Sequence, residues 1–168
     1  VDGSGLKHTL ERQAIGWMQK EGVFDFSQGR VLLVSAVDRF GMAEALSQAC
    51  SKVVYGDLCF GLGLPLPLRR FSSVTILGRL LLPIVTRMPI QVFYPTGEKQ
   101  EKRTPKFAKL FNEADLIAGD WHFIRRFAPD RLDGKMVLTQ TLRKADLEWL
   151  ASIGVQQAVT TTPEVGGE

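Results

Sequence analysis

The chain has 168 residues, of which 45% are hydrophobic and 23% charged, and 21 basic against 18 acidic residues leave a formal charge of +3. This length and balance predict one folded domain with a sizeable core and exclude a disordered or low-complexity chain. The excess charge is small and scattered, so we expect no nucleic-acid partner. The two cysteines form no CxxC pair and have no histidine at metal-ligand spacing, which predicts buried or idle thiols and no metal site.

The sequence predicts no membrane-spanning segment. Its most apolar run, residues 74–85, is too short to cross a bilayer and is interrupted by Gly78, Arg79 and Pro83. Because there is also no signal peptide, we expect a cytoplasmic protein without a membrane partner. The chain opens without an initiator methionine and stops just after a predicted strand, so we expect a fragment of a longer protein.

Helical periodicity and short β-branched runs alternate along the chain. The first predicted helix, residues 6–20, has Leu10, Ala14, Trp17 and Met18 near one face. Further helices are predicted over residues 41–51, 71–87 (kinked or broken at Pro83), 105–113 and 142–153, with residues 120–127 as a loop or short helix. Strands are predicted over residues 31–34, 53–55, 90–94, 116–118, 135–139 and 155–160.

This alternation predicts the α/β fold class for one domain over residues 1–168. We expect a doubly wound, mainly parallel six-stranded sheet, Rossmann-like, with helices on both faces. The strand order is predicted as 3-2-1-4-5-6, with a flavodoxin-like order as the alternative.

The segment over residues 30–46 is a strand, a tight turn and a helix start, where a doubly wound protein holds a phosphate-bearing ligand. Set against GxGxxxG, Ser35 and Val37 replace the first two glycines and only Gly41 remains. Valine would crowd a pyrophosphate, and Asp38 would repel one unless Arg39 compensates. The loop predicts cofactor contacts from Ser35, Ala36, Val37, Asp38, Arg39 and Gly41, and an ordinary strand–turn–helix is the alternative.

Asp57 follows the second predicted strand, 22 residues after Ser35. An acid at this place can accept a hydrogen bond from a ribose 2′-hydroxyl, and it would favour NAD over NADP because it repels a 2′-phosphate. The alternative is that Asp57 only caps the following loop.

A polar cluster follows the fourth predicted strand. His122 is a candidate general acid–base residue or a hydrogen-bonded structural one. Arg125 and Arg126 are candidates to clamp a carboxylate or phosphate. With Asp120, these residues indicate an enzyme acting on a phosphorylated or carboxylated substrate as one alternative function.

Several segments carry a family resemblance over essentially the whole chain, namely VDGSGLKHTLE, VSAVDRFGMAEAL, YGDLCFGLGLPLP, YPTGEKQ, AGDWHFIRRFAPD and VTTTP. They resemble bacterial quinate/shikimate 5-dehydrogenase-like proteins. The resemblance implies that Asp2 contacts the hydroxyls of a cyclic polyol acid and assists proton transfer. It also implies that Thr160, Thr161 and Thr162 lie near a nicotinamide.

The resemblance therefore implies an NAD(P)-binding domain of an oxidoreductase that acts on a polyol carboxylate, with a homodimer left open. The family's catalytic lysine belongs to an N-terminal substrate domain that this sequence lacks, so we expect the fragment alone to be inactive. The alternative is a Rossmann-like domain that binds a non-dinucleotide ligand or a partner protein, without dehydrogenase activity.

Overall fold

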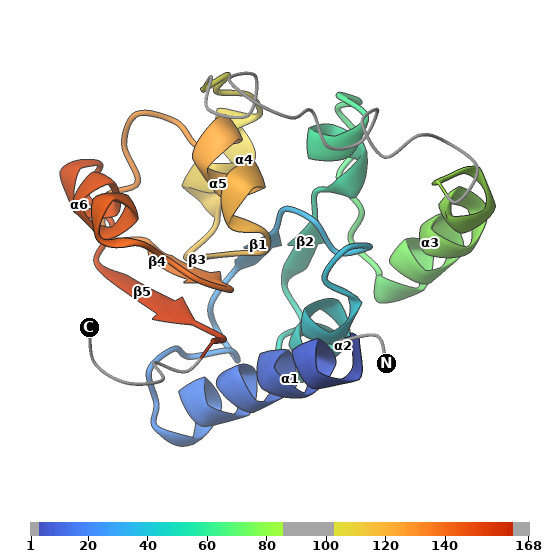
Figure 1. Cartoon of the computed structure of the whole chain (residues 1–168), viewed down its shortest axis with the longest axis horizontal. Helices are drawn as coiled ribbons and strands as arrows, with labels where there is room; N and C mark the ends of the chain where they lie inside the picture. The colour runs from blue at the N-terminus through green and yellow to red at the C-terminus, as the bar shows by residue number, and fades with distance from the viewer. Residues whose placement is uncertain (1–3, 86–102, 163–168) are drawn as a thin grey trace.

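A computed structural model describes residues 4–85 and 103–162. In these ranges the chain forms one parallel sheet of five strands in the order β2-β1-β3-β4-β5 (Figure 1). The strands are β1 (Val31–Leu33), β2 (Val53–Tyr55), β3 (Leu116–Ala118), β4 (Met136–Thr139) and β5 (Gln157–Thr160). All four strand pairs are parallel, so the carboxyl ends of the strands meet at one edge of the sheet.

Helices cover both faces of the sheet (Figure 1). One face carries α1 (Ser4–Lys20), α2 (Phe40–Ala49) and the start of α3 (Phe71–Val85). The π-helical turn η1 (Asp57–Gly61) and the helices α4 (Ala108–Glu113), α5 (Trp121–Phe127) and α6 (Lys144–Ser152) pack on the other face. This burial on both sides explains why the inner strands are continuous apolar runs rather than alternating ones.

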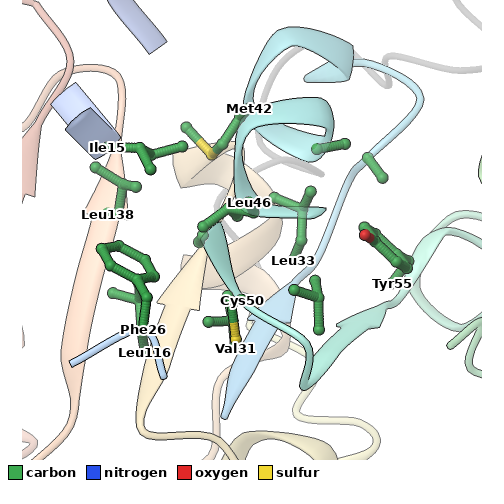
Figure 2. Packing of buried hydrophobic residues seen from close by; sticks show 14 of the residues in the cluster. Ile15, Phe26, Val31, Leu33, Met42, Leu46, Cys50, Tyr55, Leu116 and Leu138 are labelled. Atoms are coloured by element: carbon green, nitrogen blue, oxygen red, sulfur yellow. The ribbon is translucent and has the colours of Figure 1, made fainter. Parts of the chain in front are cut away.

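Two hydrophobic cores result, one on each face. In the first, Ile15 of α1 and Met42 and Leu46 of α2 pack over Leu33 and Leu138 of the sheet (Figure 2). In the second, Phe60, Phe111 and Trp121 are among the residues packed against the opposite side of the strands. The helix α1 therefore belongs to the domain and packs directly against α2.

The structure corrects three expectations. The sheet has five strands in the described ranges instead of the predicted six, and the predicted strand 90–94 lies outside those ranges. The order of the described strands is that of the predicted 3-2-1-4-5-6 sheet without its third strand, residues 90–94, and it is also the flavodoxin-like order of five strands. The helix α3 continues through Pro83 to Val85, and Trp17 is 48% exposed, while Ile15 and Met18 are buried.

The expectation of buried thiols is confirmed. Cys50 and Cys59 are free and buried. Across residues 4–85 and 103–162, no helix has the length and apolar character needed to cross a membrane. The same ranges contain no group of three or more His, Cys, Asp or Glu side chains placed to hold a metal ion.

Candidate functional site

The candidate site is the loop from the end of β1 to the start of α2, at the carboxyl edge of the sheet. The first N–H groups of a helix have no partner within the helix, and in dinucleotide-binding proteins they receive the pyrophosphate. Here Oε2 of Glu11 accepts a hydrogen bond from the backbone N of Met42 at 2.9 Å. Glu11 comes from α1 and is 0% exposed. A carboxylate of the chain therefore lies where a phosphate would cap α2.

A second carboxylate occupies the loop itself. Oδ1 of Asp57 accepts a hydrogen bond from the backbone N of Val37 at 2.8 Å. Val37 stands at the place of the second glycine, so the amide that would approach a pyrophosphate is already engaged. The Val37 side chain is half-buried and packs against the first core.

Burial raises the pKa of Asp57, and hydrogen bonds from the Val37 and Ala36 amides offset this only in part. The nearby Asp38 carboxylate adds to the rise. Within the described residues, Oδ2 of Asp57 is buried and has no hydrogen-bond partner. Asp57 is therefore directed into the protein, where it caps the loop. The sequence left open that Asp57 caps the loop that follows β2, whereas the structure shows its hydrogen bond to the loop that follows β1.

Arg39, the residue expected to balance an added phosphate, is buried among carboxylates. Its guanidinium forms ion pairs with Asp120 at 2.9 Å, Asp38 at 3.3 Å and Glu11 at 3.4 Å. With Asp57, the described residues of the loop region include four carboxylates and one guanidinium. An incoming pyrophosphate would meet net negative charge, and Arg39 would have to leave an existing ion pair to bind it.

The polar network continues to the ends of β3 and β4. Oδ2 of Asp120 accepts a hydrogen bond from Gln140 at 3.0 Å, and its Oδ1 caps α5 by accepting the N–H of His122 at 2.9 Å. The backbone N of Asp120 donates to Oγ of Ser35 at 3.1 Å. Asp120 therefore ties the ends of β1, β3 and β4 together. Gln140 was missed from the sequence, where its only signal is its place directly after a predicted strand.

Gly119 allows this close approach. Its φ is +128°, and a Cβ at this position would lie 2.7 Å from Cγ2 of Val34. A side chain here would be strained and would also separate the ends of β1 and β3.

The predicted cluster after the fourth expected strand is not a single site. Asp120 faces Arg39, whereas Arg125 pairs with Asp146 of α6 at 2.6 Å and lies 5.5 Å from the ring centroid of Trp149. Arg126 lies over the ring of Phe127. His122 is exposed on the first turn of α5.

The remaining predicted residues lie as follows. Thr160 ends β5 and is exposed, Thr161 is buried with its N–H on the Thr139 carbonyl, and Thr162 pairs with Thr141 at 3.1 Å between hydroxyl oxygens. Ser35, Ala36 and Gly41 are buried in the loop and the first turn of α2. Asp2 lies outside the described residues, so its role stays a prediction.

The residues present do not fit a pyrophosphate in the usual pose, because Glu11 and Asp57 hold the amides that would bind it. The fold and the site together define an α/β domain with an all-parallel sheet, helices on both faces and an acid-rich carboxyl edge. The chain belongs to the family described as Domain of unknown function (DUF8754), whose model matches residues 5–168. No curated protein and no solved structure matches it.

Proposed function

We propose that this is a Rossmann-like domain that binds a non-dinucleotide ligand or a partner and has no dehydrogenase activity of its own. The observation that carries the proposal is the hydrogen bond from the Met42 amide to the buried Glu11 carboxylate. The N–H of Met42 in the first turn of α2 is therefore not a free donor for a phosphate. The nearby Arg39 is already engaged in ion pairs with Glu11 and Asp120.

The charge at this edge favours a neutral or cationic ligand. The exposed Asp38 lies beside the half-buried Asp57 and Asp120, and Arg39 pairs with Asp38 and Asp120. Hydroxyl or amino groups of a ligand can donate to carboxylates, whereas phosphate and carboxylate groups would be repelled. We therefore expect small anions to bind this edge weakly or not at all.

The quinate/shikimate dehydrogenase-like function implied by the resemblance is the second candidate. It is favoured by the position of Asp57, which follows β2, and by that of residues 160–162, which end and follow β5 at the carboxyl edge. Under this proposal the Glu11 carboxylate would have to leave the end of α2 before the cofactor binds.

Calorimetric titration with NAD and with NADP tests the choice. For the wild-type protein we expect no saturable heat at millimolar concentrations of either cofactor, and saturable heat would overturn the proposal. Glu11→Gln removes the charge but keeps an oxygen acceptor for the Met42 amide. Glu44→Gln is the matched control, because Glu44 also links α2 to α1, through Arg12, but lies away from the loop.

A further inference from the structure

A leucine-bearing loop, residues 61–68, connects η1 to α3 beyond β2 (Figure 1). Its sequence GLGLPLPL alternates leucine with glycine or proline. Leu62, Leu64 and Leu66 are 53%, 45% and 58% exposed, so none of them serves the core. Three large apolar side chains held in water on one short loop are typical of a contact surface.

The backbone of this loop is unusually well satisfied. Carbonyl oxygens of the chain accept every N–H between positions 62 and 68, from Leu62, Gly63, Leu64, Leu66 and Leu68. The other two residues, Pro65 and Pro67, have no N–H to satisfy. An unpaired N–H is costly in apolar surroundings, which restricts the loops that can enter lipid. In this segment no donor would be left unpaired by transfer out of water.

The charge next to the loop is positive. Arg69 and Arg70 follow it directly, and both are exposed. Positions 58–97 contain four arginines and no aspartate or glutamate. On α3, Ile76 and Leu80 are also exposed, at 58% and 65%. Apolar side chains beside exposed arginines, in a stretch of sequence without acids, match a lipid surface that carries phosphates.

We propose that the leucine-bearing loop docks this domain onto an anionic phospholipid surface. Leu62, Leu64 and Leu66 enter the boundary between headgroups and acyl chains, and Arg69 and Arg70 pair with lipid phosphates. A fluid bilayer accepts leucines spread along a loop without a complementary groove. A second copy of the chain facing this loop would bring the arginine pairs against each other, which disfavours self-association here.

This proposal departs from the expectation of no membrane partner, which rested on the lack of a spanning segment. A peripheral contact needs no spanning helix, only apolar side chains and attraction to charged headgroups. The inference uses residues 62–70, none of which belongs to the candidate site, and does not depend on the proposed function of that site.

Cosedimentation with vesicles tests the proposal. We expect the wild-type protein to partition at least about tenfold more strongly onto phosphatidylcholine vesicles containing phosphatidylserine than onto phosphatidylcholine alone, and less strongly at high salt. The double variant Leu64→Ser/Leu66→Ser should lose about tenfold in partitioning. Leu147→Ser is the matched control, since Leu147 is 48% exposed on α6, and it should bind as the wild type does.

The electrostatic part has its own variant. Arg69→Gln/Arg70→Gln should lower partitioning onto the phosphatidylserine vesicles by about tenfold or more. Circular dichroism and the urea midpoint of each variant confirm that it is folded. Equal partitioning onto both lipids, or full retention of binding by the leucine double variant, would overturn the proposal. A solution dimer that the leucine double variant dissolves would also overturn it, because the leucines would then serve a protein contact.

Discussion

Replacing Glu11 by alanine should destabilise the domain more than replacing a partly exposed acid on the same pair of helices. The side chain caps α2 through Met42 and pairs with the buried Arg39. Loss of an N-terminal cap costs about 1 kcal/mol. Loss of one partner of a buried guanidinium costs about 2 kcal/mol more, because Arg39 keeps its pairs with Asp120 and Asp38. We therefore expect the free energy of unfolding to fall by about 3 kcal/mol.

Urea denaturation followed by circular dichroism measures this loss as a lower midpoint at an unchanged slope. Glu11→Gln should cost less, about 1–2 kcal/mol, because its amide oxygen still accepts the Met42 N–H. The control Glu44→Ala removes a partly exposed ion pair with Arg12 and should cost at most about 0.5 kcal/mol. If Glu11→Ala costs no more than Glu44→Ala, Glu11 does not close the end of α2 as described.

Three further substitutions test the loop and its supports. Gly119→Ala should lower the free energy of unfolding by about 2–3 kcal/mol, since φ is +128° and Val34 leaves no room for a Cβ. Gly16→Ala, at a helical position with nothing within 4 Å of a new Cβ, should raise it by about 0.5–1 kcal/mol. Thermal unfolding distinguishes these two outcomes, and equal effects would contradict the argument. Burial raises the pKa of Asp57, so its stabilising contribution is present below its ordinary pKa of 3.8 and is lost as the pH rises through the raised value. Asp57→Asn should therefore flatten the dependence of the urea midpoint on pH above 3.8, and an unchanged dependence would show that Asp57 does not cause it.

The sequence predicted the strands that position the site well, because short buried strands depend on local sequence patterns. The strands β2 and β3 have the predicted bounds, and Asp57 lies directly after β2 as expected. Apolar runs bounded by polar turns fix such strands, and parallel pairing brings their carboxyl ends to one edge. The replaced glycines also indicated that the loop departs from GxGxxxG, and the structure adds that the Val37 amide is bonded to Asp57.

The content of the site depended on contacts between distant residues. Glu11 lies 31 positions before Met42. The sequence predicted Trp17 on the apolar face of the helix that carries Glu11, whereas Trp17 is exposed. The usable signal was its spacing, since Glu11 precedes Ile15 and Met18 by four and seven residues on the buried face. A charged residue on that face needs a buried partner, and Arg39 provides one. That Glu11 also accepts the N–H of Met42 could be known only from the packing of α1 against α2.

Carboxylates of the chain hold the amides that a dinucleotide would need. Nitrogen-15 NMR tests this by following the backbone amide resonances of Val37 and Met42 while NAD is added to the wild-type protein. We expect both resonances to stay in place at millimolar NAD, because Asp57 and Glu11 keep these hydrogen bonds. A saturable shift of both resonances would contradict it and would place the cofactor in the loop after all.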